Sequence, residues 1–69
     1  MVNECPQIAL ASKYGVVETA ALLGISKQTL LKYSNIGSRA GGIDFGIRKS
    51  NGRKFYTGKQ IINFWQLNN

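Results

Sequence analysis

The chain has 69 residues, enough for one small domain with a modest hydrophobic core. Its hydrophobic content of 43%, with a single proline, is typical of a folded protein and excludes a chain that is disordered in its ground state. Nine lysines and arginines against three acids give a net charge of +6, which favours a polyanionic partner.

The residue types that most enzymes use are scarce. The chain has no histidine, and its three acids, Glu4, Glu18 and Asp44, are scattered. Cys5 is the single cysteine, which excludes a disulfide within the chain, and no residue spacing suits zinc. The sequence therefore predicts a protein that is not an enzyme and holds no cofactor or metal.

No segment indicates secretion or a membrane span. The N-terminus lacks a charged stretch followed by an apolar run, and the longest apolar runs are a few residues. We expect a cytoplasmic protein without a membrane partner. It should form a single domain over residues 1–69, with residues 1–5 as a frayed tail.

Helical patterns occupy the first half of the chain. Pro6 suits the first position of a helix that would reach about Tyr14. The stretch "VVETAALL", residues 16–23, has the apolar spacing of a second helix. The core face of this second helix is expected to be Val16, Ala20 and Leu23, broadened by Val17 and Ala21.

A third helix is predicted over residues 27–36. Gly24 supplies a sharp exit from the preceding helix, Ser26 is a good N-cap, and Gly37 closes the helix. Its apolar positions are Leu30, Leu31, Tyr33 and Ile36.

After the loop at residues 38–42 the apolar period changes to two. Ile43, Phe45 and Ile47 alternate with polar or small residues, as in a half-buried strand. The turn signal "SNG" at 50–52 then precedes a return strand at 53–57.

The length of the hairpin turn decides which side chains of the two strands share a face, so the apolar residues predict the turn. A two-residue turn at Asn51 and Gly52 would set Ile47 opposite Tyr56. A three-residue turn with Gly52 in a left-handed bulge would set Ile47 opposite Phe55. We favour the three-residue turn because it groups the apolar side chains on one face.

A last helix is predicted over residues 58–67. Thr57 and Gln60 have the spacing of a capping box at its start. Its apolar face, which should close the core, consists of Ile61, Ile62, Phe64 and Trp65.

This order of elements predicts a mainly α fold with a two-stranded β wing, a winged helix-turn-helix. Six residues match the positions of the bacterial helix-turn-helix pattern in order. They are Ala20 (small), Gly24 (turn glycine), Ile25 (hydrophobic), Ser26 (cap), and Leu30 and Tyr33 (both hydrophobic). The stretch "SNGRKFYTGKQIINFW", residues 50–65, resembles the wing and following helix of MerR-like and excisionase-type small DNA-binding proteins. The resemblance covers about residues 16–67.

The resemblance implies sequence-specific binding of double-stranded DNA by an excisionase (a recombination directionality factor) or a small transcriptional regulator. An excisionase would have a recombinase and further copies of itself as partners. MerR-type regulators continue into a dimerisation helix and an effector domain, which residues 1–69 do not contain. No small-molecule effector is therefore expected.

The candidate DNA contacts lie on the third helix and the hairpin. The first turn of a recognition helix meets base edges, where Lys27 suits guanine or a phosphate and Gln28 suits adenine. The recognition-helix candidates are Ser26, Lys27, Gln28, Thr29, Lys32 and Tyr33. The wing and loop candidates, for phosphates or the minor groove, are Arg39, Arg48, Lys49, Asn51, Arg53 and Lys54.

Two other functions are considered. A protein-binding adaptor or phage-type inhibitor would use the same fold without DNA, and would present an exposed apolar patch such as Leu31 with Ile36. RNA binding is disfavoured because no aromatic stacking platform stands out in the sequence.

Overall fold

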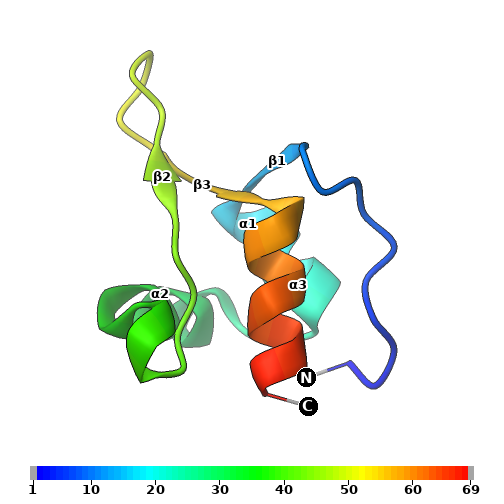
Figure 1. Ribbon diagram of the computed structural model, residues 1–69. Helices are drawn as coiled ribbons and strands as arrows, with labels where there is room; N and C mark the ends of the chain where they lie inside the picture. Colours follow the sequence, from blue (N-terminus) through cyan, green and yellow to red (C-terminus); the bar gives the residue numbers. More distant parts are fainter. Residues whose placement is uncertain (1, 69) are drawn as a thin grey trace.

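The computed structural model describes residues 2–68 and has three α-helices and a three-stranded antiparallel sheet (Figure 1). The elements, in chain order, are β1 (Lys13–Gly15), α1 (Val16–Leu23), α2 (Lys27–Ile36), the 3-10 turn η1 (Ser38–Ala40), β2 (Gly46–Ile47), β3 (Lys54–Thr57) and α3 (Gly58–Leu67). The strand order is β1-β3-β2, so β3 is central. In Figure 1 the sheet crosses the top of the molecule, the helices lie below it, and the β2–β3 hairpin projects upward.

The three main helices begin and end where the sequence predicts, because their end signals are local. Ser26 caps α2: its hydroxyl oxygen accepts a hydrogen bond from the Thr29 N–H at 3.1 Å. Thr57 and Gln60 form the reciprocal capping box at the start of α3, with hydrogen bonds of 3.0 and 3.2 Å. These cap predictions are confirmed.

The predicted helix from Pro6 to about Tyr14 is wrong. Residues 2–12 contain no helix and lead into the short strand β1, which pairs with β3. The sheet therefore has three strands, and the prediction of a two-stranded wing is corrected.

The reason for this extended segment lies at the start of α3, whose first N–H groups need acceptors. The Gly58 N–H donates to the Ser12 carbonyl at 3.0 Å, and the Lys59 N–H donates to the Leu10 carbonyl at 3.1 Å. The contact is very close, since a Cβ atom on Gly58 would lie 2.0 Å from the Ala9 carbonyl oxygen. These tertiary bonds outweigh the helical pattern of residues 6–14.

The hairpin turn is one residue longer than predicted. The Arg48 N–H donates to the Arg53 carbonyl at 2.9 Å, so residues 49–52 form a four-residue loop. Gly52 adopts the expected left-handed conformation, with φ +67°. The Asn51 side chain accepts a hydrogen bond from the Arg53 N–H at 2.9 Å, which stabilises the longer loop.

The longer loop shifts the strand register. Ile47 lies opposite Lys54, and Gly46 lies opposite Phe55, so both predicted partners of Ile47 are wrong. Ile47 is 52% exposed rather than part of an apolar cluster. The strand is also shorter than its alternation suggested, because β2 contains two residues.

The core lies between the sheet and the helices. Its buried hydrophobic residues are Ala20, Leu23, Leu30, Ile43, Tyr56, Ile61 and Phe64. The buried hydroxyls of Tyr56 and Ser34 are 2.7 Å apart, which joins β3 to α2 without an unsatisfied polar group. On α1 the predicted broadening of the core face by Val17 and Ala21 is wrong, since both are exposed and Thr19 is buried instead.

The beginning of the described chain is tied to the helices. Val2 lies in the stretch expected to fray, yet its N–H donates to the Leu23 carbonyl at 2.9 Å. The Trp65 indole N–H donates to the Val2 carbonyl at 3.0 Å. Across residues 2–68, none of the helices has the length and apolar character that a membrane span requires.

Candidate nucleic-acid interface

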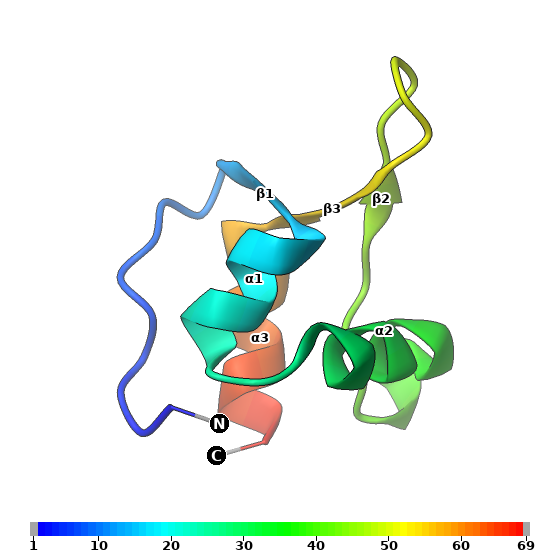
Figure 2. The same ribbon diagram turned by 180° about the vertical axis from the view of Figure 1, so that it is seen from behind.

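A groove of about 620 Å³ runs between the first turn of α1, the start of α2 and the β2–β3 hairpin. Figure 2 shows α1 in front, with α2 to its lower right and the hairpin rising at the upper right. The groove is lined by Gly15, Val16, Val17, Glu18, Lys27, Arg48, Asn51, Arg53 and Lys54. Segments from both halves of the chain thus share one concave surface.

Four of these lining residues, which we term the groove cations, are Lys27, Arg48, Arg53 and Lys54. Lys27 is the first residue of α2, placed by the Ser26 cap. Arg48 and Arg53 are joined across the hairpin by a backbone hydrogen bond, and Lys54 begins β3. Within residues 2–68 none of the groove cations has an ion-pair partner, so their charge is available to an outside anion.

One carboxylate also lines the groove. Glu18 is in the first turn of α1, where a negative charge interacts favourably with the helix dipole. Four cations and one carboxylate leave the lining with a net charge of +3.

The N-terminus of α1 adds further positive potential. Its N-cap residue, Gly15, provides no side-chain hydrogen bond, so the first-turn N–H groups have no side-chain cap. These groups belong to residues that line the groove. Their partial positive charge reinforces that of the groove cations.

The remaining recognition-helix candidates divide into free and engaged side chains. Gln28 and Lys32 are exposed on α2. The Ser26 and Thr29 hydroxyl oxygens are 2.8 Å apart, so both take part in the helix cap. Tyr33 packs inward against Phe64, with ring centroids 4.9 Å apart, which makes it a packing residue.

The remaining wing and loop candidates are placed differently. Asn51 lines the groove, while Lys49 is exposed in the hairpin loop but does not line it. Arg39 is in η1, after the C-terminal end of α2, and is absent from the groove lining. The structure therefore brings together Lys27, Asn51 and three cations of the hairpin, and leaves Arg39 apart from them.

The sequence did not predict that one further basic residue, Lys13, lies near the hairpin. Lys13 was assigned to a helix, but it lies in β1 with its ammonium nitrogen 5.0 Å from the centroid of the Phe55 ring. No local signal could have found it, because β1 forms only by pairing with β3.

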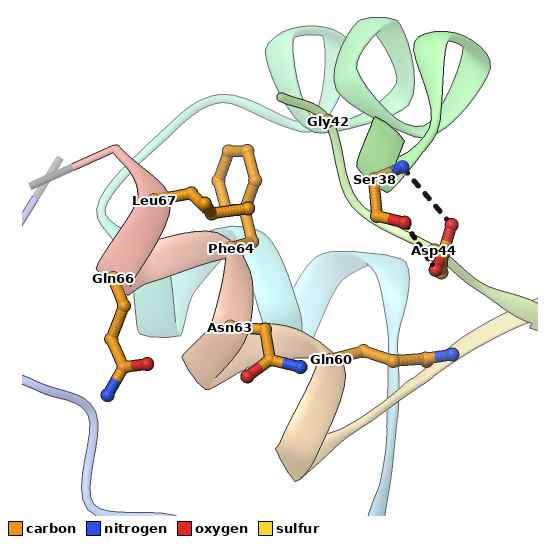
Figure 3. Close-up of a pocket in the computed structure, with 8 residues that line it drawn as sticks. All are labelled: Ser38, Gly42, Asp44, Gln60, Asn63, Phe64, Gln66 and Leu67. Carbon is orange, nitrogen blue, oxygen red and sulfur yellow. Dashed lines mark hydrogen bonds between the residues drawn. The ribbon is translucent and has the colours of Figure 1, made fainter. Parts of the chain in front are cut away.

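A second cavity, of about 340 Å³, lies between the η1 loop and α3 (Figure 3). Its lining contains no cation and consists of Ser38, Gly42, Asp44, Gln60, Asn63, Phe64, Gln66 and Leu67. In Figure 3 the Asp44 carboxylate accepts two hydrogen bonds from Ser38, one from the hydroxyl at 2.7 Å and one from the N–H at 3.2 Å. This lining does not suit a polyanion.

We expect the Asp44 carboxylate to make the η1 loop sensitive to acid. The hydroxyl of Ser38, its N–H and the nearby charge of Arg39 lower the pKa of Asp44 below its ordinary value of 3.8. Because the folded-state pKa is depressed, this stabilisation is present above pH 3.8 and is lost as the pH falls through the folded-state value.

Urea denaturation of wild type and Asp44→Asn, from about pH 6 to about pH 2.5, measures this effect. The stability advantage of wild type should be constant at the upper end of the range and should shrink toward zero at the acid end. A difference that does not change with pH would contradict the assignment.

Comparisons of the chain with protein-family models, with curated proteins and with solved structures find no match. Within residues 2–68, no group of three or more histidine, cysteine, aspartate or glutamate side chains is placed to hold a metal ion.

Proposed function

We propose that this protein binds double-stranded DNA as a winged helix-turn-helix protein of the excisionase or small-regulator kind. The observation that carries the proposal is the convergence of the four groove cations, from α2 and from the hairpin, on one surface without ion-pair partners. Clustered cations of this kind repel one another in the free protein and are neutralised by a phosphate backbone.

The two sides of the groove suit different parts of a duplex. α2 follows α1 after a tight turn at Gly24, and its exposed first turn presents Lys27 and Gln28. In this proposal that turn enters the major groove and meets base edges. The hairpin, with Arg48 and Arg53, lies on the adjacent phosphates or the minor groove.

The third strand extends this arrangement without blocking it. β1 pairs with β3 as far as Gly15 opposite Phe55. Beyond that point β1 covers neither Lys54, the first residue of β3, nor Arg53, which precedes it, and both residues line the groove. β1 therefore braces the base of the wing and leaves its basic end free.

The proposal includes the partners that each kind of protein requires. An excisionase would bind its site with further copies of itself and a recombinase, whereas a small repressor would occlude a promoter. Both kinds of protein act by occupying a site on DNA and catalyse no reaction themselves.

The alternative, a protein-binding adaptor without DNA, depends on an apolar patch at Leu31 and Ile36. Ile36 is 48% exposed, but Leu31 is half-buried. Only one of the two residues of the expected apolar patch is therefore exposed, and the DNA proposal is preferred.

Fluorescence anisotropy with a random-sequence duplex across a salt series tests the proposal. We expect affinity to fall steeply with salt, and the slope of log affinity against log salt to become shallower by about 2 in Arg53→Ala/Lys54→Ala. Lys27→Ala/Gln28→Ala should lower the slope by about 1 and weaken discrimination between sites selected from a random pool. A folded wild type that does not bind duplex at low salt would overturn the proposal.

A further inference from the structure

The outer face of the sheet carries an aromatic ring with no neighbouring side chain on either adjacent strand. Tyr56 of β3 points into the core and is fully buried, so its neighbour Phe55 points to the opposite face. The residues paired with Phe55 are Gly15 on β1 and Gly46 on β2. Both are glycines, so neither neighbouring strand places a side chain beside Phe55.

The Phe55 ring lies across β2. A Cβ atom on Gly46 would be 2.4 Å from the Cζ atom of Phe55, so a larger residue at position 46 would displace the ring. The tip of the ring occupies the space that a side chain at position 46 would take, and Phe55 as a whole is half-buried. The ring is thus held at the surface of the sheet and not in the core.

Two cations accompany this ring. The ammonium nitrogen of Lys13 is 5.0 Å from the ring centroid, and the guanidinium carbon of Arg48 is 5.7 Å from it. Both distances are within the range of cation–π attraction. Lys13 and Arg48 are exposed and have no ion-pair partner within residues 2–68.

We propose that Phe55, Lys13 and Arg48, which we term the Phe55 platform, bind an unpaired nucleobase of a single-stranded nucleic acid. The base would stack on the Phe55 ring, displacing a cation that now lies over it, and the two cations would hold the flanking phosphates. An aromatic ring on an open sheet with adjacent cations is the combination by which single strands are bound without reading their sequence.

This site adjoins the proposed duplex-binding groove and shares one residue with it. Arg48 belongs to both surfaces, since it lines the groove and contacts the Phe55 ring. The proposal does not require duplex binding: it concerns a ring that the groove does not use. It also explains why the sequence showed no platform, because Gly15 and Gly46 meet Phe55 only in the folded sheet.

The test compares two fluorescent oligomers that have the same number of phosphates, about twelve thymidines and an abasic strand of equal length. Wild type is expected to bind the thymidine strand about 5- to 150-fold more tightly than the abasic one, the factor that one stacked base supplies. Phe55→Leu should abolish this preference without changing the affinity for the abasic strand. A uridine strand of the same length shows whether RNA is bound equally.

Phe45→Leu is the matched control. Phe45 is also half-buried and also has a cation nearby, the Lys54 ammonium 5.0 Å from its centroid, but its ring packs edge-on against Tyr56. This variant should keep the preference for bases.

Phe55→Trp keeps an aromatic face and should also keep the preference, which provides a test even where Phe55→Leu is poorly folded. Thermal melts establish which variants are folded. Equal binding of the two strands by wild type, or a preference that survives in folded Phe55→Leu, would overturn the platform. Either result leaves the duplex proposal standing, because the groove cations test it separately.

Discussion

The variant with all four groove cations replaced by glutamine is expected to bind duplex DNA about a thousandfold more weakly than wild type at about 0.1 M salt. Each phosphate contact contributes about 0.9 to the slope of log affinity against log salt. Four contacts therefore raise the affinity by about three to four powers of ten when the salt concentration falls from about 1 M to about 0.1 M. The groove cations have no ion-pair partner within residues 2–68, so the variant breaks no internal pair. Anisotropy of a labelled duplex measures the loss.

A control of equal charge separates the groove from net charge. It replaces Arg39 and Lys59, two exposed cations outside the groove lining, α2 and the hairpin, and is compared with Arg53→Gln/Lys54→Gln. Both double variants lose two positive charges from +6 and have a net charge of +4. The control is expected to lose about threefold or less, since its charges act only at a distance, whereas the groove double variant should lose roughly fiftyfold. Equal losses in the two variants would contradict a defined interface in the groove.

Phe64→Ala is expected to destabilise the protein by about 3–5 kcal/mol. Phe64 is 1% exposed, and its ring packs against that of Tyr33, which joins α3 to α2. A chain of this size has a total stability of roughly 3–10 kcal/mol, so the substitution removes much of it. Urea denaturation followed by circular dichroism measures the change in the free energy of unfolding.

Leu67→Ala is the control for that measurement. Leu67 and Phe64 both line the cavity between the η1 loop and α3, but Leu67 is 64% exposed. Its truncation should therefore lower the free energy of unfolding by about 0.5 kcal/mol or less. A loss below about 1 kcal/mol in Phe64→Ala would show that the packing of α3 against α2 contributes little to stability.

The parts of the fold that the sequence predicted well depend on signals a few residues apart. The Ser26 cap and the capping box of Thr57 and Gln60 each act within one turn of helix, and the three main helix ranges followed from such signals. The alternation at residues 43–47 was also local and indicated a strand, but it could not fix the strand's length or partners.

The incorrect predictions of the first helix and of the hairpin register concern hydrogen bonds outside the regular helices and strands. Residues 6–14 have an acceptable helical pattern, but the unpaired N–H groups at the start of α3 bind the carbonyls of Ser12 and Leu10. The four-residue hairpin loop that sets the register is closed by backbone bonds between Arg48 and both Arg53 and Gly52, and by the bond from the Arg53 N–H to the Asn51 side chain. None of these bonds can be read from the spacing of apolar residues.

The candidate site was predicted in part. Lys27, Asn51 and the hairpin cations were named from the sequence, and the fold places them in one groove. Tyr33 is a packing residue, and Lys13 was missed because its strand exists only through β3. Contact of these residues with DNA stays a prediction.

The anchoring of Val2 determines where the molecule can be joined to something else. Val2 is held by Leu23 and by Trp65 near the end of α3, so the two ends of the described chain lie close together. In Figure 1 this end of the molecule is far from the hairpin. A label, a carrier domain or a second copy attached there leaves the groove unobstructed. Two copies joined by a flexible linker long enough to span adjacent sites would bind a double site by avidity, with no change to the groove itself.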